Sequence, residues 1–471
     1  MRLEASRRLP GNPSRLPGRG DWAPRLFVLL VSFVVAFWSG GFGDPARLAL
    51  VLAGAVGLLA SALRSPESLA SAFRSLPVAG LLGLTLVGAI SLAWTRAGVQ
   101  DAAMIAMIPA AYAGLVVFAA GDPMLRRRRD LVGIWLAALA VISAITGLIG
   151  VMFEIGPWAI WLGGRLRPAG VVEYPPALAL LQLGAMPVLA RGWLGGKNCL
   201  WMVAGGSLII GSSIILLAQS RVVLFLACVL IAVWLAWPER SLGVNRTEAM
   251  WAVLLWLTGG LLVTLGVQTF DSWPAAILCV LVLLAVPRVA SNALDRLRRA
   301  VPVGVRSTGP AVAAIVLIGL MAAGAAAVLL ASPGLTDQGM QADQGFDHGR
   351  VELWRVSANA ASEEPLLGHG QGAFLETTIE EQDSPVRFAH SLVLESAVET
   401  GIPGALLACL VLVGSMACCW KRRLDFTAWL YIPMVFGFSA LALVDWTWHL
   451  TGIGAAWALC LGCLLMNRPD I

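Results

Sequence analysis

Long apolar stretches separated by short polar segments occupy most of the chain. Most of these stretches approach the ~20 residues that a helix needs to cross the hydrocarbon of a bilayer. Their length and their content of Leu, Ala, Val and Gly favour helices over the alternating strands of a membrane barrel, each about ten residues long. We place fourteen candidate spans near residues 26–42, 48–63, 76–94, 99–120, 131–153, 171–190, 199–218, 222–237, 250–269, 274–290, 310–331, 401–419, 427–443 and 450–466. The pattern predicts an all-α, polytopic integral membrane protein with about 12–14 transmembrane helices.

The composition excludes a water-soluble globular enzyme. Of the 471 residues, 58% are hydrophobic and 13% are charged, whereas soluble domains average ~45–50% and ~25%. The eight cysteines all fall in apolar stretches, where we interpret them as small apolar fillers. Cys460 and Cys463 have the spacing of a metal or redox pair, but no companion ligands accompany them in the sequence, so we expect neither kind of site.

The charges are distributed asymmetrically across the predicted membrane. With the N-terminus on the cytoplasmic side, 25 of the 33 Lys and Arg residues fall on that side, and 18 of the 28 Asp and Glu residues fall on the other. Because short cytoplasmic loops retain positive residues, this distribution favours an even number of spans with both termini inside. The net charge of +5 is therefore a topology signal, and we expect no nucleic-acid partner.

This topology divides the chain into four parts. They are a cytoplasmic basic tail (1–25), an N-terminal transmembrane helix bundle (26–331), one large extracytoplasmic loop (332–400) and C-terminal transmembrane helices (401–471). The loop is too short for an independent domain with a large core. It holds three of the four histidines, many acidic residues and several glycines. A polar loop that is tied to helices at both ends is a natural place for chemistry at a membrane surface.

Three motifs follow one another through this loop and its exit. They read Gly-Arg-Val-Glu-Leu-Trp at 349–354, Pro-Leu-Leu-Gly-His-Gly-Gln-Gly-Ala-Phe at 365–374, and Ala-His-Ser-Leu-Val-Leu-Glu at 389–395 with Glu-Thr-Gly-Ile-Pro-Gly at 399–404. Here the chain resembles the O-antigen ligase and polymerase superfamily of bacterial membrane glycosyltransferases. Those proteins carry an arginine closely followed by a tryptophan, a Pro-Leu-Leu-Gly-x-Gly-x-Gly-x-Phe segment, and an Ala-His-x-x-x-Leu-Glu helix that ends in Glu-x-Gly-Ile-Pro-Gly.

Other segments extend this resemblance. Gln-Ser-Arg at 219–221 is similar to the family's Ser-Arg motif, and residues 164–177 are similar to its Arg-x-x-Gly segment before a Pro-Asn pair. Pro176 stands where the family more often has asparagine. Residues 445–449 resemble the start of a late family helix. The likeness runs from about Arg165 to Gly462, and the first five spans match only in hydrophobicity.

The resemblance implies an inverting, metal-independent transfer of a glycan at the outer face of the bacterial cytoplasmic membrane. The donor would be a polyprenyl-diphosphate-linked glycan, and the acceptor a hydroxyl of a glycan or glycolipid; no cofactor is implied. Arginine suits such a donor because its planar, permanently charged fork matches phosphate oxygens. We therefore predict that Arg221 and Arg350, with Arg167, bind the diphosphate and neutralise the charge that develops on it.

His390 is the predicted catalytic base. A neutral imidazole with an ordinary pKa of ~6.5 can take a proton from a sugar hydroxyl near neutral pH. His348, two residues before Arg350, is a possible supporting residue. Glu395 and Glu399 are also possible supporting residues, because a helix would place them one turn apart on one face.

These assignments have structural alternatives. Arg221 could extend to the membrane surface or pair with a carboxylate, and Arg350 could pair with Glu352 or another acid of the loop. His390 could cap a helix or pack within the loop. Glu395 and Glu399 could form a paired-carboxylate glycosidase site, although we favour a helix that supports His390.

The glycines of the second motif have two possible interpretations. Gly368, Gly370 and Gly372 could suggest a phosphate-binding loop, but no strand precedes them and no helix start follows cleanly. We therefore expect them to form a tight turn that positions the loop.

Several functional classes fit the sequence. A ligase and a polymerase differ only in the acceptor, and the sequence is compatible with both. A polytopic transporter or flippase of lipid-linked saccharides is the main alternative, since it would also use arginines to bind substrate. It would have no need of His390 or of the ordered motifs in the loop, because transporters concentrate polar residues within the spans near the midplane. A non-catalytic scaffold for glycan assembly would leave the arginines on the outer side without a purpose.

Overall fold

The computed structural model describes residues 22–128, 130–162, 165–195, 200–236, 246–269, 272–300, 349–382 and 385–466. The protein is about 81% helical, with almost no sheet among the described residues. Three sequence predictions fall outside them: the first part of the basic tail, the span at 310–331, and His348. Arg25, counted above with the tail, lies inside the first helix.

The helices of the first half of the chain follow one another with short connections. They are α1 (Ala23–Ala36), α2 (Asp44–Arg64), α3 (Pro66–Phe73), α4 (Leu76–Ser91), α5 (Val99–Gly121), α6 (Pro123–Arg127), α7 (Asp130–Phe153), α8 (Pro175–Gly195), α9 (Leu200–Ala218), α10 (Arg221–Ala236), α12 (Arg246–Thr269) and α13 (Ser272–Ala300). Short 3₁₀ turns occur at η2 (Ser39–Gly41) and η3 (Gly170–Val172).

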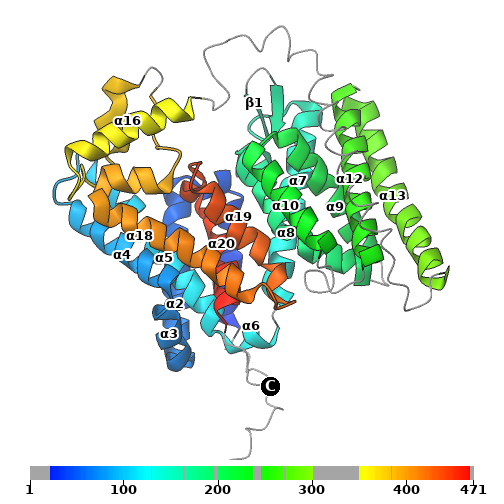
Figure 1. Ribbon diagram of the computed structural model, residues 1–471, viewed down its shortest axis with the longest axis horizontal. Helices are drawn as coiled ribbons and strands as arrows, with labels where there is room; N and C mark the ends of the chain where they lie inside the picture. Colours follow the sequence, from blue (N-terminus) through cyan, green and yellow to red (C-terminus); the bar gives the residue numbers. More distant parts are fainter. Residues whose placement is uncertain are drawn as a thin grey trace, which may run out of the picture.

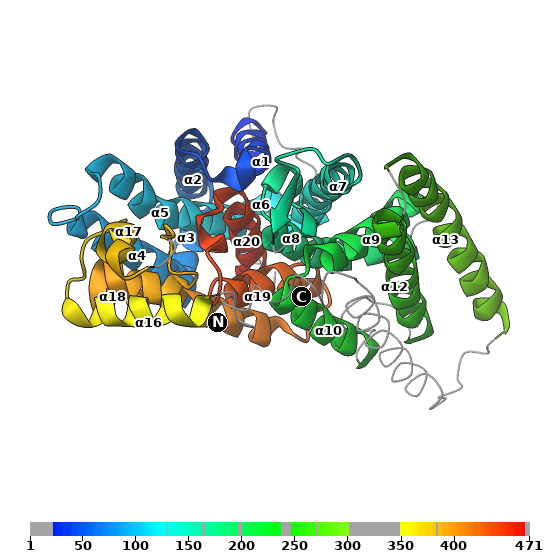
Figure 2. The same cartoon turned by 90° about the horizontal axis from the view of Figure 1, so that it is seen from above.

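The remaining helices are α16 (Arg350–Glu363), α17 (Phe374–Thr378), α18 (Leu392–Arg422), α19 (Ile432–Leu441) and α20 (Thr451–Leu465). They are joined by the 3₁₀ turns η4 (Ile379–Glu381), η5 (Ala428–Leu430) and η6 (Thr447–His449). Figure 1 shows α16 beside α18 and α4 on one flank, and α9, α12 and α13 on the other. Between the flanks lie α7, α8, α19 and α20, and the view from above shows the same order (Figure 2).

The prediction of a polytopic all-α membrane protein is confirmed. Among the described residues, eight helices are long and apolar enough to cross a membrane, and five shorter apolar helices accompany them. Each predicted span corresponds to one of these helices, except the span at 310–331, which lies outside the described residues. The helix α18 begins at Leu392, within the stretch that the sequence assigned to the loop.

Close packing of the helices depends on small residues. A Cβ added to Gly54 of α2 would lie 2.7 Å from the carbonyl oxygen of Ala111 in α5, which real Cβ atoms do not approach so closely. An added Cβ on Gly462 of α20 would lie 2.5 Å from the carbonyl oxygen of Val116, also in α5. In a lipid environment, where apolar burial gives little drive for association, such contacts allow helices to gain van der Waals energy. The helix α5 is therefore packed between α2 and α20.

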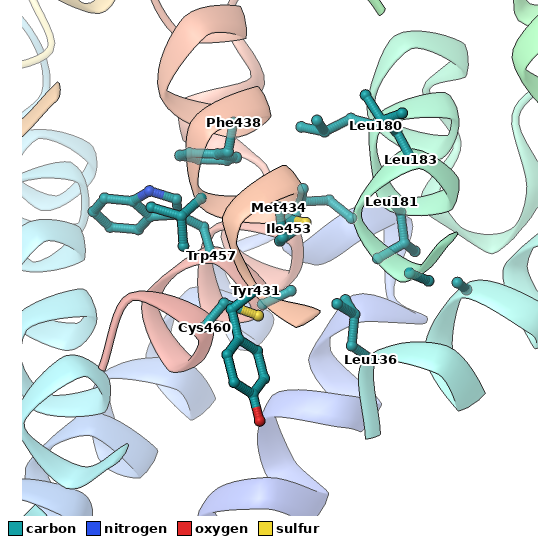
Figure 3. Close-up of a cluster of buried hydrophobic side chains, with 14 of the residues drawn as sticks. Leu136, Leu180, Leu181, Leu183, Tyr431, Met434, Phe438, Ile453, Trp457 and Cys460 are labelled. Carbon is teal, nitrogen blue, oxygen red and sulfur yellow. The ribbon is translucent and has the colours of Figure 1, made fainter. Parts of the chain in front are cut away.

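A second part of the core lies where α7, α8, α19 and α20 meet. Figure 3 shows Leu180 and Leu181 of α8 facing Met434 and Phe438 of α19, and Phe438 stacks on Trp457 of α20. These side chains are almost fully buried. The core therefore fixes the C-terminal helices, and the turn between them, against the middle of the chain.

One element was not predicted. The strands β1 (Ala159–Leu162) and β2 (Arg165–Pro168) pair as an antiparallel hairpin, in which Ala159 lies opposite Pro168 and Leu162 opposite Arg165. The sequence pattern missed it because each strand has only four residues, too few for a detectable alternation of polar and apolar side chains. This hairpin carries Arg167.

A buried ion pair joins α1 to the end of α5. The Nε of Arg25 lies 2.7 Å from Oδ2 of Asp122, and the two side chains are 7% and 3% exposed. The other oxygen of Asp122 accepts hydrogen bonds from the backbone amides of Met124 and Leu125 at the start of α6. Removal of one partner of a buried pair is costly because the other charge stays in a low dielectric.

We predict that Asp122→Ala destabilises the protein by about 3–5 kcal/mol and lowers its thermal unfolding midpoint in detergent. Asp130→Ala is the matched control, because Asp130 lies 3.8 Å from Arg128 with both side chains more than half exposed. An exposed pair contributes about 0–1 kcal/mol. Equal midpoints for the two variants would contradict a stabilising role for the Arg25–Asp122 pair.

Candidate functional site

His390 lies directly before the first turn of α18. Ser391 is the N-cap residue of this helix, and its hydroxyl accepts a long hydrogen bond of 3.5 Å from the amide of Leu394. The amide of Leu392 donates to the carbonyl of Ala442 at 2.9 Å, which fixes the start of α18 on the end of α19. His390 therefore does not cap the helix itself. Its φ of 51° is in the left-handed region, which a non-glycine residue seldom adopts unless the surroundings impose it.

The glycines of the second motif form tight turns, as the sequence predicts. Gly368, Gly370 and Gly372 have φ values of 65°, 98° and 76°. The amide of His369 donates to the carbonyl of Val398, and the amide of Gly370 to the carbonyl of Glu399, at 2.9 and 2.8 Å. These bonds attach the turn to α18.

The same turn is attached to the end of α4. The indole of Trp94 donates to the carbonyl of Gly368 at 3.2 Å, and the hydroxyl of Thr95 donates to the carbonyl of Gln371 at 2.8 Å. His369 is buried, and its Nε2 lies 2.9 Å from the carbonyl oxygen of Ala360 in α16. His369 thus has a structural role, which links α16 to the turn.

The kink in α18 accommodates this turn. Gly401 has a φ of 71° and a ψ of −165°, and the amide of Ile402 donates to the carbonyl of Pro365 at 2.8 Å. A Cβ on Gly401 would lie 2.6 Å from the carbonyl carbon of Leu366. The Glu-Thr-Gly-Ile-Pro-Gly sequence therefore lets α18 bend around the Pro-Leu-Leu-Gly segment.

The carboxylate of Asp445 connects three segments of the chain. Its Oδ2 accepts from Nη2 of Arg350 at 3.0 Å and from the hydroxyl of Tyr174 at 2.8 Å. Its Oδ1 accepts from the hydroxyl of Thr447 at 3.0 Å. The Asp445 side chain is 0% exposed, whereas that of Arg350 is 27% exposed. One buried carboxylate thus ties the start of α16 and the segment before α8 to the turn between α19 and α20.

Asp445 was not among the site residues predicted from the sequence. The available signal was the resemblance of residues 445–449 to a family helix, which gave no partner for the carboxylate. Glu352, the alternative partner considered for Arg350, instead pairs with Arg355 at 2.5 Å on the surface of α16. Burial and the negative charge of Asp445 raise the pKa of Tyr174 well above its usual value, so the phenol stays a donor.

The surroundings of His390 favour a neutral imidazole. Burial lowers the pKa of His390 below its ordinary value of 6.5, and the positive charges of Arg350 and His449 lower it further. The negative charge of Asp445 opposes this shift. The Nδ1 of His390 is buried and has no hydrogen-bond partner within the described part of the chain. The imidazole of His390 therefore lies within the electrostatic influence of Arg350 and has a ring nitrogen that can accept a proton.

Glu395 and Glu399 have separate partners. The Oε1 of Glu395 lies 2.6 Å from Nε2 of His449, and its Oε2 accepts from the amide of Ala389 at 3.2 Å. Glu399 accepts a hydrogen bond from the Gln371 side chain and others from the backbone of the glycine turn. Both glutamates are buried. These contacts favour a role in support of His390 and of the turn over a pair of catalytic carboxylates.

Arg167 and Arg221 belong to a second group of cations. Arg167 lies on β2, and Arg221 is the first residue of α10. Burial lowers the pKa of Arg167, and the positive charges of Arg165 and Arg221 lower it further. The Nε of Arg167 and the Nη2 of Arg165 are buried without a hydrogen-bond partner among the described residues. An anion bound here would offset the mutual repulsion of the three arginines.

The structure therefore brings His390 and Arg350 together around Asp445, and Arg167 and Arg221 together at the hairpin. Tyr174 connects the two regions, because it follows the hairpin in the chain and donates to Asp445.

Residues 206–409 match the family model described as O-antigen ligase. The match covers Arg221, Arg350, His390 and both glutamates, and it ends before Asp445. Among curated proteins, no sequence matches this chain.

We predict that Gly370→Ala destabilises the site, because the added Cβ would overlap the backbone of Thr95 at a φ of +98°. The strain alone costs about 1–3 kcal/mol. The thermal unfolding midpoint in detergent should fall by several degrees, and the yield of folded protein should drop. Gly98→Ala is the control, since nothing lies within 4 Å of its added Cβ. Unchanged unfolding in Gly370→Ala would mean that the turn does not pack on α4 in this way.

Proposed function

We propose that this multi-pass membrane protein, whose residues 206–409 match the family model described as O-antigen ligase, transfers a glycan from a polyprenyl-diphosphate donor to an acceptor hydroxyl. The transfer takes place at the outer face of the bacterial cytoplasmic membrane and inverts the anomeric centre. The observation that supports this proposal most directly is the shared environment of His390 and Arg350 around the buried Asp445. A base and a permanent cation are the two groups that such a transfer requires.

His390 acts as the general base. Its neutral imidazole takes the proton of the acceptor hydroxyl as the oxygen attacks the anomeric carbon of the donor sugar. A new bond forms between that carbon and the acceptor oxygen, while the bond from the carbon to the phosphate oxygen breaks on the opposite face. The polyprenyl diphosphate leaves with the electron pair, and the imidazolium later releases its proton to solvent.

The arginines stabilise the leaving diphosphate. Arg350 is held by Asp445 through one nitrogen and remains partly exposed, so its orientation is fixed while some of the guanidinium stays accessible to a ligand. Arg221 and Arg167 supply positive charge from the hairpin region. Charge that is already oriented costs no reorganisation when the phosphate oxygen becomes negative, which is the main source of such stabilisation. His348, Glu395 and Glu399 are proposed as supporting residues.

We predict that His390→Ala and His390→Gln lower the transfer rate by roughly 10²–10⁴-fold, the usual contribution of general base catalysis. Arg350→Ala should lower it by roughly 10²–10³-fold. Each variant is expressed in a strain that lacks the gene, and surface glycans are analysed on gels beside the pool of lipid-linked glycans. Arg355→Ala is the matched control, because this α16 arginine is exposed and paired only with Glu352 in the contacts described above.

The same experiment distinguishes the functional classes. Long glycans that accumulate on the polyprenol in the His390 variants indicate a ligase, and single repeats on the final acceptor indicate a polymerase. Normal glycans in both the His390 and Arg350 variants would reject the proposed roles. A donor pool confined to the cytoplasmic leaflet would indicate the transporter instead.

The pH dependence follows from the lowered pKa of His390. The base acts in its neutral form, so kcat/KM should be constant near neutral pH and fall as the pH drops through the lowered pKa, below the ordinary value of 6.5. Initial rates of donor consumption between about pH 5 and 8 test this, with membranes of the deletion strain as the source of donor and acceptor. An acid limb above 6.5 would contradict the effect of burial on His390.

A further inference from the structure

The two oxygens of Glu395 hold the groups on either side of the catalytic histidine. One oxygen lies 2.6 Å from Nε2 of His449, and the other accepts from the amide of Ala389 at 3.2 Å. Ala389 directly precedes His390, whose backbone is left-handed. A carboxylate that binds this amide restrains the turn on which the imidazole is presented. The side chain of Glu395 is 6% exposed, so water does not compete effectively for these contacts.

His449 is held in place by three further features. Its ring stacks on Phe388, with the centroids 3.9 Å apart and the planes at 18°. Phe388 in turn stacks on Trp446, at 5.7 Å and 9°. The backbone of His449 belongs to the 3₁₀ turn η6, whose first residue, Thr447, bonds to Asp445. The imidazole therefore has one orientation, set by residues from both sides of the site.

The function described above assigns no role to His449. Its Nδ1 is buried and has no hydrogen-bond partner within the described residues, like the Nδ1 of His390. The charged and titratable groups that act on His390 are Asp445, Arg350 and His449, and Glu395 acts through His449. Two buried imidazoles thus lie close enough to interact, and one of them is tied to a carboxylate.

We propose that Glu395 and His449 are positioning residues for His390, and that they act as one unit. This proposal rests on the function proposed for His390. Glu395 restrains the left-handed turn through the amide of Ala389 and fixes the ring of His449, and this ring stacks on Phe388, two residues before His390. The unit therefore sets the orientation in which the base is presented to the acceptor.

The test compares His449→Asn, Glu395→Gln and the double variant with the wild type in the full-length protein. His449→Asn removes the electrostatic effect of His449, which lowers the pKa of His390, so this pKa should rise. The acid limb of kcat/KM should then move to higher pH. We expect kcat to fall about tenfold or more at pH 7 in both single variants, while KM for the extracted lipid-linked donor stays the same, because the arginines are intact.

The double variant tests whether the two residues are one unit. Its rate should equal that of the slower single variant, because once one residue of a unit is replaced, replacement of the other has no further effect on the rate. Multiplicative losses would overturn the proposal. An acid limb that stays at the wild-type pH in His449→Asn would also overturn it, even if the rate falls.

Two controls separate positioning from folding. His369→Asn replaces another buried histidine of the same region, whose Nε2 contacts the carbonyl of Ala360, and should lower stability without moving the acid limb. Glu352→Gln replaces an exposed glutamate of α16 and should leave the rate unchanged. Rates are normalised to folded protein by size-exclusion chromatography in detergent. If His390→Ala keeps full activity, the proposed function fails; if His390 is essential but the acid limb does not respond to His449, only the positioning unit fails.

Discussion

The arrangement of the site depends on the buried carboxylate of Asp445. An ionised carboxylate in a low dielectric is unfavourable unless donors replace its lost hydration. Three donors do so here, from Arg350, Tyr174 and Thr447. Each donor comes from a different element, so the interaction that stabilises the charge also fixes three segments relative to one another. The carboxylate thus joins the start of α16 and the segment before α8 to the turn that carries His449.

The arginines that were predicted to bind the diphosphate lie in two regions, which differ in how far the positive charge is balanced by a carboxylate. Arg350 has a permanent anionic partner and needs no ligand to be stable in its position. In the other region, Nη2 of Arg165 and Nε of Arg167 are buried without a hydrogen-bond partner among the described residues, and the charges of Arg165 and Arg221 lower the pKa of Arg167. Arginines without an anionic partner gain more electrostatic energy from a bound anion than an arginine that is already paired with a carboxylate. In the proposed function, a diphosphate would therefore gain most near Arg165 and Arg167, whereas Arg350 is already neutralised by Asp445.

The membrane helices and the glycine turn could be predicted from the sequence, whereas the contacts between distant segments could not. Apolar runs identify membrane helices because each span must be apolar over its own length, and this is a local property. The glycines at 368, 370 and 372 predict a tight turn for the same reason. The partner of Arg350 is 95 residues away in the chain, and no local pattern marks it. The nearby Glu352 was the more obvious candidate, yet it lies on an exposed helix surface, where Arg355 is its neighbour. No pattern in the sequence predicts the hairpin that carries Arg167, because each of its strands has only four residues.

Contacts with other elements of the fold impose the left-handed backbone conformation of His390. A non-glycine residue in this conformation costs on the order of 1–3 kcal/mol and persists only where neighbours impose it. Here, Glu395 binds the amide before His390, and the amide of Leu392 after it bonds to α19. Both contacts come from the C-terminal helices, whose positions are set by the core around Met434, Phe438 and Trp457. The apolar packing of α19 and α20 therefore helps to determine the direction in which the imidazole of His390 points.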